Sequence, residues 1–218
     1  MALTIWHLLT RLGEAQILLP ATVLTLVSLV RHAEGRLLAV CWIAALGIAT
    51  LLTTATKLAF IGWGWGWPGL NFTGISGHAM FAAAVYPLLL ATLASRTRAG
   101  FQNVALLVGC LLALTVGVSR VVLGAHSESE VVAGLLLGAL VSVLAWIRGR
   151  AAGVRMRPLI PILVMSWLVF MPAHAPASQS HQVVTQLALK LSGHSHPYTR
   201  RDMLRSVHPV HPVHMPMT

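Results

Sequence analysis

Two histidines, two basic residues and a carboxylate lie near the ends of long apolar stretches in this sequence. Arg120 closes one such stretch, and His126 and Glu130 begin the next, within GVSRVVLGAHSESEVVAG at residues 117–134. The chain has only five acidic residues, and ionisable groups at membrane depth are costly enough to indicate function. If the next apolar stretch forms a helix that begins near Ser127, Glu130 lies about one helical turn beyond His126. The carboxylate can then bind one imidazole nitrogen and leave the other as a nucleophile.

The same segment also has a purely structural interpretation. Ser127 and Glu130 fit a capping box, S-x-x-E immediately before an apolar helix. Capping accounts for these two residues but gives no reason for Arg120 or His126. Capping and catalysis are compatible, so we expect both at this helix start.

A second group of polar residues ends the stretch GWGWGWPGLNFTGISGH at residues 62–78. Ser76 is expected to be the N-cap of the apolar helix that follows, and the free N–H groups there form a ready anion site. Gly77 allows a ligand to approach the backbone closely, and His78 comes next. This helix start is therefore a candidate phosphate site.

Lys57 stands at the end of an apolar stretch, with no acidic residue nearby in sequence. Alone, it is expected to snorkel to the membrane interface, but beside Arg120 it forms one side of a phosphate clamp. Two histidines suit phosphoryl transfer through a phosphohistidine, because one can attack while the other protonates the leaving oxygen. No cysteine, aspartate pair or His/Glu spacing supports a catalytic metal, and no cofactor is expected.

The elements that must position this chemistry are strongly apolar. Of the 218 residues, 56% are hydrophobic and 9% are charged, whereas a soluble domain has about a quarter charged residues. Lipid must be the solvent for much of the chain, so we expect an all-α, polytopic membrane helical bundle. About six transmembrane helices are predicted, at residues 15–30, 37–56, 79–94, 101–118, 131–147 and 159–172.

The arginines predict an orientation and argue against nucleic acid as a partner. The net charge is +10, but the arginines form short clusters between apolar runs and no basic groove. Arginine-rich loops alternate with loops holding one basic residue, and the positive-inside rule makes the arginine-rich loops cytoplasmic. Both polar loops and the C-terminal tail then share the extracytoplasmic face of a bacterial-type inner (cytoplasmic) membrane.

Both ends of the chain are expected to lie outside the spans. Residues 2–14 have the amphipathic pattern of a helix lying along the membrane interface. Residues 181–192 predict a similar helix, whereas residues 193–218, rich in His, Pro, Met and Arg, are expected to be disordered. The predicted domains are a membrane-embedded domain, 1–172, and an extracytoplasmic tail, 173–218.

The spacing of the polar residues resembles the signature of the type 2 phosphatidic acid phosphatase superfamily, in its membrane branch. The three signature stretches of that family are K-x6-RP, PSGH and SR-x5-H-x3-D. Ser119, Arg120 and His126 match the third stretch, with Glu130 in place of aspartate. The resemblance covers about residues 37–147 and leaves the tail and the N-terminal helix outside.

The other two stretches are matched less completely. The triplet SGH at residues 76–78 matches the second stretch, with isoleucine in place of proline. Lys57 begins the first stretch, but Gly64 and Trp65 stand where the family has arginine and proline. Loss of a bidentate phosphate donor can cost several kcal/mol of transition-state binding.

Three explanations of the missing arginine are open: replacement by another donor, an altered substrate, or an inactive descendant. The candidate donors are the loop backbone amides, the indole N–H groups of Trp63, Trp65 and Trp67, the Asn71 amide, and Arg200 or Arg201 of the tail.

The resemblance also implies a role for each matched residue. His126 would be the nucleophile, Glu130 its orienting partner, and His78 the general acid for the leaving group. The phosphate would be bound by the remaining matched residues, Lys57, Ser76, Gly77 and Arg120.

The function implied is that of an integral-membrane, metal-independent lipid phosphatase acting on a phosphomonoester or diphosphate. Its partners would be the lipid phosphate substrate and the phospholipid bilayer, and undecaprenyl diphosphate is the first choice of substrate. Lipid phosphotransfer at the same site and non-catalytic binding of an anionic lipid are the alternatives. A small transporter is disfavoured, because no Gly/Pro-broken pair of spans recurs in two halves of the chain.

Overall fold

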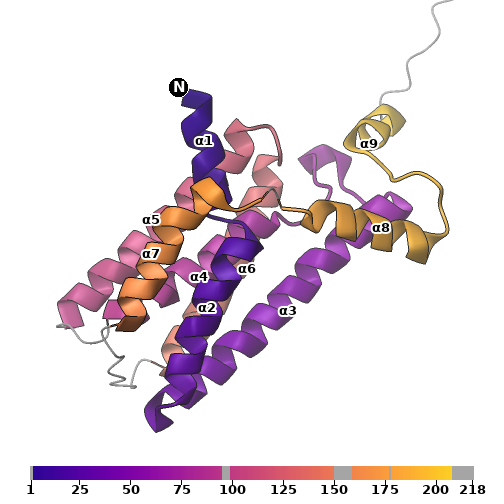
Figure 1. Ribbon diagram of the computed structural model, residues 1–218. Helices are drawn as coiled ribbons and strands as arrows, with labels where there is room; N and C mark the ends of the chain where they lie inside the picture. The colour runs from indigo at the N-terminus through magenta and orange to yellow at the C-terminus, as the bar shows by residue number, and fades with distance from the viewer. Residues whose placement is uncertain (1, 95–98, 150–158, 177, 208–218) are drawn as a thin grey trace, which may run out of the picture.

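The fold is built from helices (Figure 1). The computed structural model describes residues 2–94, 99–149, 159–176 and 178–207. Within these ranges every regular element is helical, apart from one isolated β-bridge between Trp67 and Phe72. The predicted all-α class is therefore confirmed.

Each of the six predicted apolar spans coincides with a helix. These helices are α2 (Ala15–Val30), α3 (Ala33–Trp63), α4 (Gly77–Leu93), α5 (Ala99–Val122), α6 (Glu128–Gly149) and α7 (Leu159–His174). Over the described residues, four stretches are long and apolar enough to cross a membrane: Thr4–Val30, Gly35–Trp63, Gly100–Val122 and Glu128–Arg148. α4 and α7 are apolar but shorter. The chain is a multi-pass membrane protein, while the number six remains a prediction.

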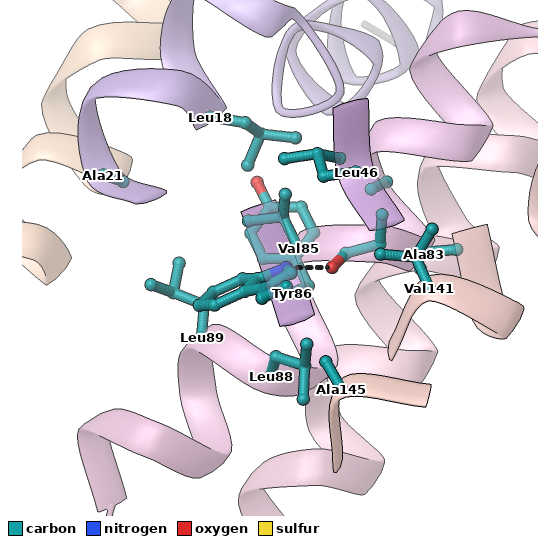
Figure 2. Packing of buried hydrophobic residues seen from close by; sticks show 14 of the residues in the cluster. Leu18, Ala21, Leu46, Ala83, Val85, Tyr86, Leu88, Leu89, Val141 and Ala145 are labelled. Carbon is teal, nitrogen blue, oxygen red and sulfur yellow. Dashed lines mark hydrogen bonds between the residues drawn. The ribbon is translucent and has the colours of Figure 1, made fainter. Parts of the chain in front are cut away.

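α4 forms the centre of the bundle, packed against α2, α5 and α6. Its sequence is apolar on all sides, as expected of a helix that other helices enclose. Figure 2 shows Val85 and Tyr86 within the buried cluster. The Trp42 indole donates to the Ala84 carbonyl at 2.9 Å, and the Tyr86 hydroxyl donates to the Leu12 carbonyl at 2.9 Å. These bonds attach α3 and the N-terminal segment to α4.

Two glycines let the backbone of α6 contact that of α4. A Cβ atom at Gly138 would lie 2.3 Å from the Met80 carbonyl oxygen, and one at Gly134 would lie 2.6 Å from the Ser76 carbonyl oxygen. Small residues at helix interfaces in membranes allow this close approach. The contact places the start of α6, which carries Glu130, beside the start of α4.

The remaining helices lie at the two ends of the chain. α1 (Ala2–Arg11) packs against α5 and α7, and α8 (Ser180–Ser192) packs against the end of α3 that precedes the tryptophan-rich loop. Both segments are helical, as their amphipathic patterns predict. Their position at a membrane interface remains a prediction.

The prediction that residues 193–218 are disordered is wrong for the part that the structure describes, 193–207. α9 (Arg200–Val207) forms there, and Met203 joins a small buried cluster with Phe60, Ile61 and Ala188. A polar composition predicts disorder because few apolar groups are available for burial. Here one methionine packed onto the end of α3 supplies that burial. Residues 208–218 lie outside the described residues.

We predict that Gly138→Ala destabilises the protein, because the new methyl group would force α6 away from the α4 backbone. Overpacking of this kind costs about 1–3 kcal/mol. The matched control is Gly47→Ala, since no atom lies within 4 Å of a Cβ placed at Gly47. Thermal unfolding in detergent should show a lower Tm for Gly138→Ala only. Equal Tm values for the two variants would contradict the close α4–α6 contact.

Candidate active site

A pocket of about 740 Å³ collects the basic residues and the histidines that the sequence singles out. Its lining includes Lys57 of α3, His78 of α4, Arg120 of α5 and His126 of the loop before α6. These residues come from four segments of the chain and surround one pocket. This agrees with the prediction that the two polar loops lie on the same face of the bundle. Lining groups with both basic and imidazole chemistry make the pocket a candidate site for an anionic substrate.

His126 and Glu130 form the predicted pair. The His126 Nδ1 atom lies 2.7 Å from Glu130 Oε2, and the Glu130 side chain is completely buried. Burial lowers the pKa of His126 from its ordinary value, and the Glu130 hydrogen bond opposes this shift. A neutral imidazole that donates through Nδ1 has its lone pair on Nε2, where it can attack an electrophile.

The capping box forms around the same carboxylate. The Ser127 N–H donates to Glu130 Oε2 at 3.1 Å, and the Glu130 N–H donates to Ser127 Oγ at 3.4 Å. The capping box is therefore confirmed, and the same carboxylate oxygen also binds His126, while a catalytic role for the pair remains a prediction.

The second oxygen of Glu130 binds the glycine-rich loop. The Thr73 N–H donates to Oε1 at 2.7 Å, and the Thr73 hydroxyl lies 2.5 Å from the same atom. Sequence reasoning missed Thr73, because a threonine in a polar loop carries no signal of its own. This contact ties the loop before α4 to the start of α6.

Arg120 is held from the N-terminal helix. Its Nη1 donates to Thr10 Oγ1 at 2.8 Å, while its buried Nε has no hydrogen-bond partner within the described part of the chain. Thr10 was not predicted either, because α1 lies outside the motif region. Ser119 is buried, and its hydroxyl donates to the Val116 carbonyl at 2.6 Å. The hydroxyl of this motif residue is therefore bonded to the backbone of its own helix, α5. The Arg120 Nε therefore keeps a donor free for a bound anion.

Ser76 occupies the N-cap position of α4, but its side chain does not cap the helix. The predicted N-cap position is therefore confirmed, although the hydroxyl makes no cap bond. The Ser76 N–H donates to the Glu130 carbonyl at 3.1 Å, and the buried Oγ lacks a hydrogen-bond partner among the residues described. Next to it, a Cβ at Gly77 would lie 3.5 Å from Lys57 Nζ. The lysine ammonium thus lies beside the N-terminus of α4.

The tryptophans do not take the place of the missing arginine in the pocket. The side chains of Trp63, Trp65 and Trp67 are 43%, 74% and 65% exposed, and none lines the pocket. They do not share one face of an extended loop, because α3 continues to Trp63 and Gly64, with φ of 73°, ends it. Trp67 then pairs with Phe72 across a tight turn. The Asn71 side chain is also absent from the pocket lining.

Among the candidate side-chain donors, Arg200 is the one that reaches the pocket, whose lining also includes the loop residues Thr73 and Gly74. It lines the pocket, and its Nη2 lies 2.8 Å from each oxygen of Glu130. Arg201 is exposed and lies outside the lining. Arg200 of the tail therefore contacts the carboxylate that binds His126.

Comparison with known proteins agrees with the motif analysis. The sequence model of the PAP2 superfamily matches residues 52–152, the range that holds the predicted phosphate and histidine residues. The chain is 34% identical over 209 residues to an "uncharacterized 22.5 kDa protein in cps region" of Klebsiella pneumoniae. The matched region covers 91% of this chain and 97% of that protein. No solved structure matches. This chain belongs to the PAP2 superfamily, the type 2 phosphatidic acid phosphatases that its motifs resemble.

Proposed function

We propose that this protein is an integral-membrane lipid phosphatase that hydrolyses a phosphomonoester or diphosphate through a phosphohistidine at His126. The observation that carries the proposal is the His126–Glu130 pair, 2.7 Å apart, at a pocket that Lys57, His78 and Arg120 also line. A protein that only binds an anionic lipid has no need of an imidazole oriented by a buried carboxylate. Membership of the PAP2 superfamily supports phosphatase chemistry.

The reaction would proceed in two steps. In the first, His126 Nε2 attacks phosphorus and the bond to the leaving oxygen breaks, while His78 gives that oxygen a proton. In the second, His78 takes a proton from water, whose oxygen attacks phosphorus and displaces the His126 nitrogen. Lys57 and Arg120, with the N–H groups at the start of α4, would stabilise the equatorial oxygens in both steps.

The shape of the pocket supports a lipid as the substrate. Its lining follows α3 from Ile61 to Thr50, and the eleven helical steps between these residues span about 16 Å. α2 contributes Ala15 and Leu19 along the same side. A phosphate bound near His126 could therefore continue into an apolar chain that lies along these helices. Undecaprenyl diphosphate is our first choice, because a released carrier lipid must be dephosphorylated on the extracytoplasmic face.

The positions of the arginines support an active site on that face. α3 begins after Arg31 and ends at the tryptophan-rich loop, and α6 has Glu130 in its first turn and Arg148 in its last turn. The pocket therefore lies at the helix ends opposite these arginines. By the positive-inside rule this end is extracytoplasmic.

We predict that detergent-purified protein releases phosphate from a panel of lipid phosphates in the presence of chelator. His126→Ala should lower kcat by at least about 10³-fold, because it removes the nucleophile. His174→Ala is the matched control, since His174 binds the Phe170 carbonyl and lies outside the pocket lining. Full turnover by folded His126→Ala, or no turnover of any lipid, would overturn the mechanism. Analysis of the products distinguishes hydrolysis from transfer to a second lipid.

A pH prediction follows from the environment of His126. Burial, Lys57 and Arg120 lower its pKa, and Glu130 raises it, with the net shift downward from 6.5. A nucleophilic imidazole must be neutral. On the acid side, kcat/KM should therefore stay constant down to pH 6.5 and fall at a lower pH, where His126 takes up a proton. Glu130→Gln should move this limb further down and reduce kcat. An acid limb above 6.5, after correction for ionisation of the substrate phosphate, would contradict the assignment.

The exposed tryptophans give a further prediction. Trp63→Phe, Trp65→Phe and Trp67→Phe should each leave kcat/KM unchanged, because the indoles lie outside the pocket lining. Steady-state kinetics on the three single variants checks this. A folded variant that loses activity would instead implicate that indole N–H in phosphate binding.

A further inference from the structure

The glycines of GWGWGWP form a surface on which the C-terminal segment packs. A Cβ at Gly66 would lie 2.6 Å from Met203 Sδ, and one at Gly64 would lie 3.0 Å from the Tyr198 ring. Trp65, between these two glycines, is exposed. The absence of side chains at Gly64 and Gly66 therefore lets Tyr198 and Met203 of the segment 193–203 pack directly on the backbone of the loop.

Hydrogen bonds fix the segment to the end of α3. The Tyr198 N–H donates to the Ile61 carbonyl at 3.0 Å, and His194 Nδ1 lies 2.7 Å from the Gly62 carbonyl oxygen. Met203 is buried between Phe60 and Ile61. These contacts hold the start of α9 next to the pocket.

The first turn of α9 has its own cap. The Thr199 N–H donates to Asp202 Oδ2 at 2.9 Å, and the Asp202 N–H donates in return to Thr199 Oγ1 at 3.4 Å. Thr199 therefore begins α9 at a fixed point, and Arg200 is the next residue. Its side chain reaches past the loop, where Nη1 donates to the Asn71 carbonyl at 3.0 Å.

Arg200 acts on the buried carboxylate. Its Nη2 contacts both oxygens of Glu130 at 2.8 Å, and Glu130 has no exposed surface. A buried carboxylate without a positive partner is strongly destabilised and tends to take up a proton. A cation beside it keeps the carboxylate ionised, so that the shared proton stays on His126 Nδ1 and the lone pair stays on Nε2.

We propose that Arg200 is a positioning residue for the nucleophile, acting on His126 through Glu130, and that the C-terminal segment is part of the active site. Gly64 stands where the family signature has its arginine, and Gly64 packs directly on Tyr198, two residues before Arg200. The positive charge absent from the loop is thus brought in by the segment that covers the loop. This inference rests on the proposed function.

The test compares Arg200→Gln with Arg201→Gln. Both remove one positive charge from α9, but Arg201 is exposed and lies outside the pocket lining. Arg200→Gln should lower kcat by about 10–100-fold, the usual effect of losing a group that orients a catalytic ligand, with little change in KM. Arg200→Lys should restore part of the loss. Arg201→Gln should behave as wild type.

The titration of His126 gives a readout that a purely structural role would not move. The charged or titratable groups around this imidazole are Glu130, Lys57, Arg120 and His78. Loss of the cation beside Glu130 strengthens the pull of the carboxylate on an imidazolium, so Arg200→Gln should raise the pKa of His126. NMR titration of histidine-labelled protein, with His126→Gln used to assign the signal, measures this shift without turnover.

A second variant tests the role of the segment without touching Arg200. Gly66→Val places side-chain atoms where Met203 Sδ lies and should displace the segment, giving the phenotype of Arg200→Gln. Combined with Arg200→Gln it should cause little further loss of kcat.

Unchanged kcat and unchanged His126 titration in Arg200→Gln, with an active wild type, would overturn this inference alone. If the wild type turns over no lipid, the proposed function fails. A pKa shift seen in Arg200→Gln and absent from Arg201→Gln would then still support the contact.

Discussion

The Glu130 carboxylate is the point at which three parts of the chain meet: the start of α6, the glycine-rich loop and the tail. Its two oxygens accept hydrogen bonds from the helix start at Ser127, the loop at Thr73 and the tail at Arg200, and one of them binds His126. Taking away a partner of a buried charge costs about 3–5 kcal/mol, so these contacts depend on one another. The backbone carbonyl of the same residue also accepts from the N–H of Ser76, which fixes the start of α4. His126, the start of α4 and the tail are therefore all positioned by this one residue.

The segments outside the matched range complete the site. Thr10 of α1 binds Arg120, and a Cβ at Gly13 would lie 3.0 Å from His78 Cβ, so the turn after α1 packs against His78. At the other end of the chain, Arg200 binds Glu130. Residues 52–152 supply the histidines and basic residues named above as lining the pocket, and the two ends of the chain support them.

Local spacing accounts for what could be predicted from the sequence. The His126–Glu130 pair and the capping box depend on helix geometry over four residues, and the apolar helices follow from runs of hydrophobic residues. The tail could not be placed in this way, because Arg200 and Glu130 are 70 residues apart and Thr10 and Arg120 are 110 apart. Residue spacing within one helix or loop cannot predict contacts between residues so far apart in the sequence. Ser76 illustrates the same point, since its N-cap position was predictable and the direction of its hydroxyl was not.

The enclosure of α4 has a consequence for where the chemistry takes place. α4 has 17 residues and is therefore about 25 Å long, which is less than the roughly 30 Å hydrocarbon thickness of a bilayer. A lipid-facing helix of that length would thin the surrounding membrane, but α2, α5 and α6 shield α4 from lipid. Its N-terminus can therefore end below the headgroup layer without any cost of mismatch. In a bilayer, the pocket at this end would then lie in a recess below the headgroups, where the N–H dipoles at the start of α4 would face a bound anion in place of bulk solvent.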